Sequence, residues 1–294
     1  MKALRKAMTH LMFACSLCAT SATFAKHLTE SPQAVPASWS NIKHVVYIIL
    51  ENETQTNALK QAFLKSLYST GAGLGNNSAI THPSQPNYIA LVSGQKTGVS
   101  GDGNVSLSYR NIADLLEAKK LTWKVYAENW PGHCFPGASN SGGYFRKHNP
   151  FISFTAIQNN PARCTNIVAG TQFFSDLSGN LLPTYSFYVP NIKNDGHDTG
   201  VAFAAKWLQA TFGPVFNNKT LMANTLFIVT FDEGKGSNNV VYTAFIGAAV
   251  KPGVVSKVKY THYSLLKTTE AIFNLGSLNT NDSKAALITD IWQP

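Results

Sequence analysis

The chain has 294 residues, of which 44% are hydrophobic and 13% are charged, and its formal net charge is +9. This composition can form one large core, and no internal repeat or low-complexity linker divides it. After the first 25 residues, no segment approaches the ~20 consecutive apolar residues that span a bilayer, so we expect no transmembrane segment in the mature chain. The positive charge suits anionic substrates or surfaces but is too modest to predict a nucleic-acid partner.

Residues 1–25 have the order of a secretory signal peptide. The basic residues Lys2, Arg5 and Lys6 are followed by a short apolar segment and then by small residues before Lys26. We therefore expect residues 1–25 to be removed and residues 26–294 to form a single domain that is secreted or periplasmic. Cleavage would remove three basic residues and leave a net charge of +6.

Two cysteines, Cys134 and Cys164, remain after the predicted cleavage. In an oxidising compartment an isolated pair most simply forms a disulfide, and no further cysteine is present to complete a thiolate metal site. The sequence therefore predicts a disulfide that closes a polar segment of the chain.

The order of the predicted elements indicates an α/β fold. Apolar runs rich in β-branched and aromatic residues predict strands at 45–50, 121–127, 185–189, 225–231 and 244–250. Between them, apolar residues at three- and four-residue intervals predict helices at 58–69, 111–120, 201–211 and 264–275. Alternating strands and helices favour a mainly parallel central sheet with helices on both faces.

Two of these strands end in polar side chains. Glu51 and Asn52 follow the first strand, and Asp232 and Glu233 follow the strand at 225–231. If the two strands are parallel neighbours, the four side chains meet at one rim of the sheet, where ligands bind in folds of this type. A divalent cation would offset the repulsion between the carboxylates. Oxygen ligands favour Ca²⁺, Mg²⁺ or Mn²⁺, whereas histidine would favour Zn²⁺ or Fe. The alternative is that the acids only cap nearby helices.

The segment 81–94 (THPSQPNYIALVSG) is typical of a helix start. Ser84 is a candidate N-cap, and Pro86 fits the first helical turn. Ser84 can therefore be a cap with no further role. Alternatively, the helix N-terminus attracts a phosphate, and a metal-bound serine hydroxyl there can attack phosphorus.

Six ordered blocks carry a family resemblance and span most of the predicted mature chain. They lie at 46–52 (VYIILEN), 83–94 (PSQPNYIALVSG), 144–154 (YFRKHNPFISF), 190–198 (PNIKNDGHD), 228–234 (IVTFDEG) and 261–270 (THYSLLKTTE). The sequence resembles the bacterial and fungal phosphoesterase family, which includes secreted acid phosphatases and phospholipases C and is similar to the alkaline phosphatase superfamily. One departure is that Glu53-Thr54-Gln55-Thr56 follows the Glu-Asn pair where the family usually has His/Arg-Ser-Phe-Asp.

The resemblance implies roles for individual residues. It implies Ser84 as the nucleophile, Asn87 as a donor to a phosphate oxygen, and a divalent metal ion (Ca, Mg, Mn or Zn). The implied metal ligands are Glu51, Asn52, Asp232 and Glu233. It further places Asp195, His197 and His262 around the phosphate, either as further metal ligands or in proton transfer, for which the two histidines are the candidates. It places His148 and Asn149 near the substrate. We expect His44, His82 and His133 to have no role at the site.

Length and layout are most similar to those of the short secreted acid phosphatases, including the mycobacterial type that acts on phosphoinositides. We therefore expect a secreted, metal-dependent phosphomonoesterase with a phosphoserine intermediate. Its substrate would be a phosphate ester, with a phospholipid or phosphoinositide as one option. The alternatives are a phosphodiesterase of the phospholipase C type and a secreted binding protein without catalysis.

Overall fold

The computed structural model describes residues 35–237 and 239–294. The expected signal peptide at 1–25 and the expected start of the mature chain at residue 26 therefore lie outside the described residues. Among the described residues, no helix has both the length and the apolar character needed to cross a membrane.

The main sheet has eight strands in the order β5-β4-β6-β1-β7-β8-β2-β9. From β5 to β7 all neighbouring strands are parallel, whereas β8 runs antiparallel to both β7 and β2. The mainly parallel α/β fold is confirmed. In sheet order the bounds are β5 Ile167–Ala169, β4 Trp123–Ala127, β6 Tyr185–Val189, β1 His44–Leu50, β7 Thr225–Phe231, β8 Thr243–Ile246, β2 Ala72–Leu74 and β9 Val255–Ser256.

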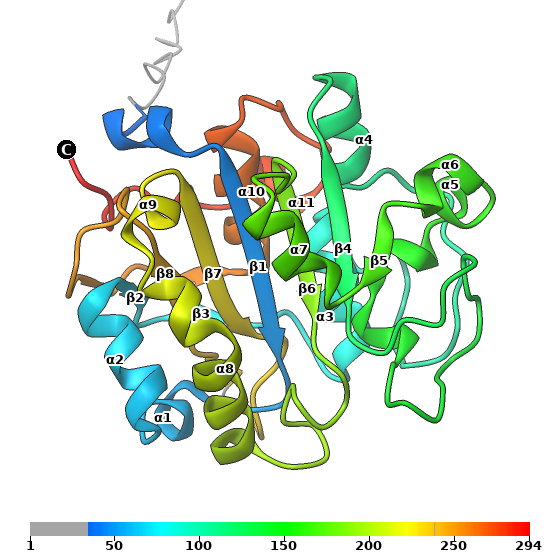
Figure 1. Cartoon of the computed structure of the whole chain (residues 1–294), viewed down its shortest axis with the longest axis horizontal. Helices are drawn as coiled ribbons and strands as arrows, with labels where there is room; N and C mark the ends of the chain where they lie inside the picture. The colour runs from blue at the N-terminus through cyan, green and yellow to red at the C-terminus, as the bar shows by residue number, and fades with distance from the viewer. Residues whose placement is uncertain (1–34, 238) are drawn as a thin grey trace, which may run out of the picture. The chain divides into compact units, whose positions relative to one another are not determined.

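Helices cover both faces of this sheet. Val45, Tyr47 and Ile49 of β1 belong to one core with α3 (Ser84–Ser93), α4 (Ile112–Ala118) and α10 (His262–Ile272). Alternate residues of β1 belong to a second core with α2 (Ala62–Thr70), α7 (Gln172–Ser178) and α8 (Val201–Phe216). Figure 1 shows α7 and α8 in front of the sheet and α3 behind it. Because both faces are covered, β1 and β7 are apolar along their length rather than alternating.

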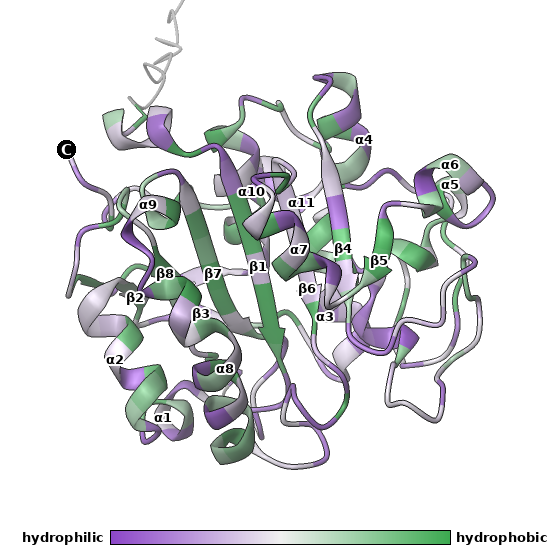
Figure 2. Ribbon diagram, viewed as in Figure 1, coloured by the Kyte–Doolittle hydropathy of each residue, from purple (hydrophilic) through white to green (hydrophobic). Residues whose placement is uncertain are grey.

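Polar loops follow the ends of β1 and β7. Figure 2 shows the lower parts of both strands as hydrophobic and the loops beyond their arrowheads as mostly hydrophilic. The shorter elements around this frame are listed by type. The 3₁₀ helices are η1 Ala37–Asn41, η2 Arg146–His148 and η3 Pro150–Ser153; the short α-helices are α1 Gln55–Ala58, α5 Thr155–Gln158, α6 Pro161–Cys164, α9 Lys219–Met222 and α11 Asn281–Lys284. β3 (Asn77–Ser78) and β10 (Tyr260–Thr261) form a separate two-stranded sheet.

Several predicted boundaries differ from the structure; the helix expected at 201–211, for example, continues to Phe216 as α8. The helix expected at 58–69 begins later, as α2 at Ala62, and Ala58 is instead the last residue of α1. The strand expected at 244–250 ends at Ile246, where Gly247 (φ +154°) lies against the backbone of Thr225. The helix expected at 264–275 begins at His262, because Thr261 is its N-cap.

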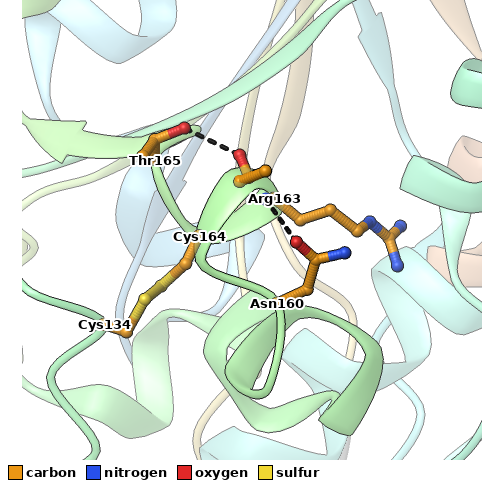
Figure 3. Close-up of a disulfide and its surroundings, with 6 residues drawn as sticks. Cys134, Asn160, Arg163, Cys164 and Thr165 are labelled. Carbon is orange, nitrogen blue, oxygen red and sulfur yellow. Dashed lines mark hydrogen bonds between the residues drawn. A yellow bond between two sulfur atoms is a disulfide. The ribbon is translucent and has the colours of Figure 1, made fainter.

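The predicted disulfide between Cys134 and Cys164 is formed, with the two Cα atoms 5.7 Å apart. Figure 3 shows it at the end of α6, whose N-cap Asn160 accepts a hydrogen bond from the backbone N–H of Arg163. Within the loop that the disulfide closes, the buried guanidinium of Arg146 donates to the carbonyls of Pro136 and Val105. The disulfide and Arg146 together fix the segment that carries His148.

Candidate active site

The acids that follow β1 and β7 are brought together by strand pairing. β1 and β7 pair in parallel, with Leu50 opposite Phe231, so Glu51 and Asp232 are the first residues beyond the two strands. The backbone N–H of Asn52 donates to Oδ1 of Asp232 at 3.1 Å. Asn52 has a positive φ of 51°, a backbone conformation that asparagine tolerates better than most residues. The expectation that these two strands are parallel neighbours is confirmed.

Ser84 lies directly over this rim. It is the first residue of α3, which has Pro83 as its N-cap and no side-chain cap hydrogen bond. Its Oγ lies 2.9 Å from Oε2 of Glu51 and 3.3 Å from Oε1 of Glu233. The Ser84 hydroxyl therefore interacts with acids from two strand ends. The expectation that Ser84 is the N-cap is wrong, because Pro83 occupies that position.

Glu51, Asp232 and Asp195 are almost completely buried. Burial, followed by the charge of Asp195, raises the pKa of Glu51 well above its usual value. Burial and the charges of Glu51 and Glu233 do the same for Asp232. Burial raises the pKa of Asp195 to about 8. Within the protein, burial and mutual repulsion therefore both favour the neutral forms of these carboxyl groups.

The donor set fits a hard divalent cation. Oδ1 of Asn52 and Oδ2 of Asp232 are buried and have no hydrogen-bond partner. Together with Glu51, Glu233 and the hydroxyl of Ser84, they are oxygen donors of the kind that Ca²⁺, Mg²⁺ and Mn²⁺ prefer. Within residues 35–237 and 239–294, no three His, Cys, Asp or Glu side chains have the arrangement of a metal site. The oxygen set at this site also includes the amide of Asn52 and the hydroxyl of Ser84.

His148 joins the acids of two strands. Its Nε2 lies 3.2 Å from Oε1 of Glu51, and its Nδ1 lies 3.0 Å from Oδ2 of Asp195. The ring also stacks on Tyr88 with centroids 5.3 Å apart. Burial lowers the pKa of His148 well below its usual value. His148 therefore lies between the end of β1 and the loop after β6, although neither of its ring nitrogens makes a hydrogen bond.

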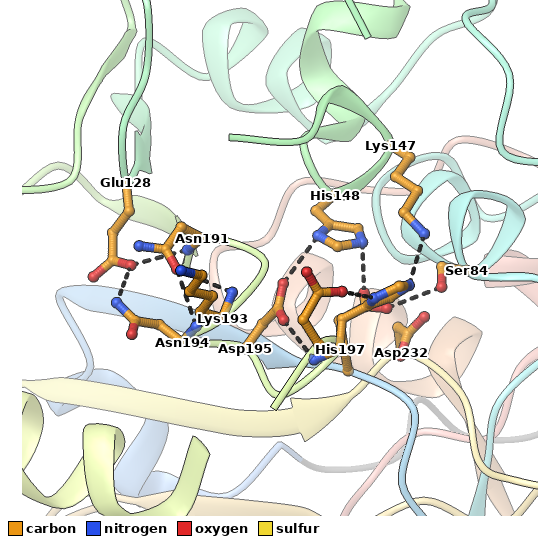
Figure 4. Close-up of polar contacts among 12 residues, drawn as sticks. Ser84, Glu128, Lys147, His148, Asn191, Lys193, Asn194, Asp195, His197 and Asp232 are labelled. Carbon is orange, nitrogen blue, oxygen red and sulfur yellow. Dashed lines mark hydrogen bonds and ion pairs between the residues drawn. The ribbon is translucent and has the colours of Figure 1, made fainter. Parts of the chain in front are cut away.

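The loop after β6 is anchored at its other end by Glu128. Oε2 of Glu128 accepts hydrogen bonds from the backbone N–H of Asn191 and the side chain of Asn194. Figure 4 shows this anchor on one side and Asp195, His148 and Ser84 on the other. The backbone of Asp195 also accepts a hydrogen bond from the N–H of Glu51. The position of Asp195 is therefore fixed by strands β1 and β4 as well as by its own loop.

Comparison with known proteins identifies the family. Residues 59–276 match the model of the phosphoesterase family. The chain belongs to the phosphoesterase family. It is 36% identical over 259 residues to a probable acid phosphatase of Kluyveromyces lactis, covering 84% of this chain and 62% of that one. It is 33% identical to a phosphatidylinositol-3-phosphatase of Mycobacterium tuberculosis, covering 85% of this chain and 82% of that one.

The chain spans about three fifths of the length of several fungal relatives, including an acid phosphatase of Aspergillus fumigatus at 34% identity, with 85% of this chain and 60% of that one covered. Solved structures support the fold alone. A Vibrio parahaemolyticus protein of the alkaline phosphatase superfamily superposes with a TM-score of 0.55 at 13% identity, covering 82% of this chain and 70% of that one. Murine ectonucleotide pyrophosphatase/phosphodiesterase 5 gives 0.57 at 11% identity, with 85% and 100% covered. The alkaline-phosphatase-like fold is confirmed.

The two histidines predicted for proton transfer differ in their surroundings in this phosphoesterase chain. His262 is fully buried, and its Nε2–H donates to the backbone carbonyl of Asp232 at 2.6 Å. Burial lowers the pKa of His262 to about 4. His197 is partly open to solvent, and its Nδ1 lies 2.8 Å from Oδ1 of Asp198. His262 therefore supports the backbone at Asp232, whereas His197 lies on the open side of the site.

The side chains of two predicted site residues, Asn87 and Asn149, make hydrogen bonds within the protein. Oδ1 of Asn87 accepts from the N–H groups of Ile80 and Thr81, and its Nδ2 donates to the carbonyls of Thr81 and Pro83. Asn87 thus holds the loop that leads to Ser84, and its role toward phosphate stays a prediction. Nδ2 of Asn149 donates to the hydroxyl of Tyr144, and its buried Oδ1 has no partner.

Four residues at the site were missed from the sequence. Tyr88 lies four residues after Ser84, one turn along the same helix face, and that spacing is the only signal that could have indicated it. His82, which was expected to have no role, contacts Oε2 of Glu233. Lys147 and Asp102 form an ion pair of 3.1 Å beside the start of α3. These contacts join segments far apart in the sequence.

Proposed function

We propose that the chain is a secreted, metal-dependent phosphomonoesterase of the acid phosphatase type that acts through a phosphoserine intermediate. The observation that carries the proposal is the position of the Ser84 hydroxyl, at the N-terminus of α3 and within hydrogen-bond distance of Glu51 and Glu233. The acid phosphatase names of the relatives support a phosphate ester as substrate.

The proposed metal ligands are Glu51, Asn52, Asp232 and Glu233, with Ser84 beside them. A bound divalent cation would supply positive charge that favours the serine alkoxide and neutralises the phosphate. The two buried oxygens without hydrogen-bond partners, on Asn52 and Asp232, support this donor set.

The chain's own residues account for the remaining chemistry. Oγ of Ser84 attacks phosphorus as its proton passes to Glu51, forming the seryl–phosphorus bond while the bond from phosphorus to the leaving oxygen breaks. The N-terminus of α3 favours the negative charge of the phosphate. His197, on the open side of the site, is better placed than buried His262 to protonate the leaving alcohol. Water then attacks the phosphoserine and gives a proton to His197 as the bond from phosphorus to Oγ breaks. Oγ of Ser84 takes its proton back from Glu51, and inorganic phosphate is released.

The experiment that tests this proposal is hydrolysis of p-nitrophenyl phosphate by the purified chain, before and after treatment with a chelator. Ser84→Ala is the variant, and Ser69→Ala, at an exposed helix position, is the matched control. We expect turnover that requires metal, disappears in Ser84→Ala and persists in Ser69→Ala. After acid quenching, the peptide that contains Ser84 should carry one phosphoryl group. Near-normal activity of Ser84→Ala would refute the mechanism.

We further propose that phosphorylated inositol lipids are substrates, because the Mycobacterium tuberculosis relative carries the name phosphatidylinositol-3-phosphatase and is covered over 82% of its length. Rates on a phosphatidylinositol monophosphate and on phosphatidylcholine distinguish a monoesterase from a phospholipase C. Faster cleavage of phosphatidylcholine would replace the proposal by the phosphodiesterase alternative. Metal or phosphate binding without any turnover would support a binding protein instead.

A further inference from the structure

Lys147 is a cation at the open side of the site that the proposed reaction does not yet use. It lies in η2, one residue before His148, and its side chain is only 13% exposed. Nζ lies 3.1 Å from Oδ2 of Asp102 and 3.2 Å from Nε2 of His197. Figure 4 shows the Lys147 side chain directed toward His197. Its charge also acts on the buried acids Glu51 and Asp195.

Asp102, the anionic partner of Lys147, also contacts the start of α3. Oδ1 of Asp102 accepts a hydrogen bond of 3.0 Å from the backbone N–H of Gln85, the residue directly after Ser84. One carboxylate therefore bridges a helix N–H beside the nucleophile and the ammonium group of Lys147. A phosphate held for attack by Ser84 is an anion that prefers the same two kinds of donor.

His197 cannot replace Lys147 as the donor in this arrangement. An ammonium group has no lone pair, so Nε2 of His197 accepts from Lys147, and the ring proton lies on Nδ1, which donates to Asp198. While Lys147 donates to it, Nε2 has no proton to donate to a phosphate oxygen, and it can carry the proton for the leaving alcohol only once Lys147 turns to the phosphate. Arg146, the neighbouring cation, is turned away toward the carbonyls of Pro136 and Val105.

We propose that Lys147 binds a non-bridging oxygen of the substrate phosphate, and that Asp102 is the internal anion which Lys147 exchanges for that oxygen. The inference rests on the proposed function in that it places the phosphate at Ser84. It adds Lys147 as a substrate-binding residue and Asp102 as an anion of the protein that competes with the phosphate. Because Asp102 competes with phosphate for the same donors, removal of its charge and removal of the lysine charge have opposite effects on phosphate affinity.

The test is binding of inorganic phosphate to the metal-loaded chain, measured by calorimetry, together with its inhibition of p-nitrophenyl phosphate hydrolysis. We expect Lys147→Met to weaken phosphate binding about 10- to 100-fold, the effect of losing one charge-assisted hydrogen bond, and to raise KM more than it lowers kcat. Lys147→Arg should restore part of the affinity. Lys193→Met removes an exposed lysine from the same rim without changing a contact to Lys147, so its phosphate affinity should be unchanged.

Asp102→Asn is the second, opposing variant. Its amide oxygen can still accept from the N–H of Gln85, but the negative charge beside Lys147 is removed. We expect phosphate to bind several-fold more tightly than in the wild type. Unchanged phosphate affinity in a folded Lys147→Met variant, or weaker binding in Asp102→Asn, would overturn the inference.

Calorimetry separates this inference from the proposed function because it does not require turnover. Phosphate binding that depends on Lys147 in a chain without hydrolytic activity would support the inference and refute the proposed reaction. Hydrolysis that requires Ser84, together with a phosphate affinity that does not depend on Lys147, would support the proposed reaction and refute the inference.

Discussion

The hydroxyl of Tyr88 donates a hydrogen bond of 2.5 Å to Oε1 of Glu51, the carboxylate whose other oxygen contacts Ser84. Tyr88 is fully buried and stacked on His148, so its ring cannot turn away without disrupting the packing. Tyr88 therefore positions Glu51 from the side opposite the nucleophile.

Tyr88→Phe should weaken metal binding about 10- to 100-fold, because partners behind a metal ligand commonly have effects of this size. The measurement is calorimetric titration of the chelator-treated chain with Mg²⁺, Ca²⁺, Mn²⁺ and Zn²⁺. Tyr260→Phe, which loses a hydrogen bond to Asp290 instead, is the matched control and should bind metal as the wild type does. Equal affinity in the two variants would show that Tyr88 does not position Glu51.

Asp232→Asn should have opposite effects on stability with and without metal. In chelator, the substitution removes a buried carboxyl group whose pKa is raised by burial and by the charges of Glu51 and Glu233. Relief of that repulsion by about 1–3 kcal/mol would raise Tm by roughly 2–4 °C per kcal/mol. With saturating metal, the variant should melt below the wild type, because a proposed ligand has lost its charge. Thermal melts in the two buffers check this, and the same order of Tm in both would contradict it.

Glu270 should make stability depend on pH away from the candidate site. Burial, together with the negative charge of Asp282, raises the pKa of Glu270 from 4.5 to about 9. Between these values the folded chain keeps a proton that the unfolded chain has lost. The free energy of unfolding therefore falls as pH rises, by up to ~1.4 kcal/mol per pH unit from this group.

Glu270→Gln removes this titration while keeping the shape of the side chain. Urea unfolding at several pH values should show similar stability for variant and wild type near pH 4, and a more stable variant near pH 8. Glu117→Gln, at a partly exposed carboxylate paired with Arg163, serves as the control and should not show this divergence. Parallel pH profiles for Glu270→Gln and the wild type would exclude the predicted effect.

Loss of the disulfide should lower stability more than activity. It joins residues 30 positions apart, and chain entropy gives a loss of roughly 3–4 kcal/mol for the Cys134→Ala, Cys164→Ala double variant. Arg146 still holds the loop through Pro136 and Val105, so folded protein at 25 °C should keep most of its turnover. Urea unfolding and assays on the same samples check both expectations. A large loss of kcat in fully folded protein would show that the disulfide itself positions the site.

The sequence by itself determined the elements that contain the candidate site. The apolar runs before Glu51 and Asp232, and the helix start at Ser84, follow from burial pattern and local backbone chemistry, which depend on neighbouring residues in the chain. The disulfide could be predicted because only two cysteines follow the expected cleavage site. These patterns indicated the fold class and the two acidic strand ends, whereas the grouping of the acids around Ser84 came from the resemblance to the phosphoesterase family.

Only the tertiary structure decided which side chains meet across distant segments. His82 contacts Glu233, and Lys147 lies between Asp102 and His197, although 151, 45 and 50 residues separate the partners. The sequence also did not show that the amide of Asn87 holds the loop before Ser84, or that His262 donates to the backbone of Asp232. Local periodicity indicates whether a residue is buried, but its partner depends on strand order and loop packing, which are set by the whole chain.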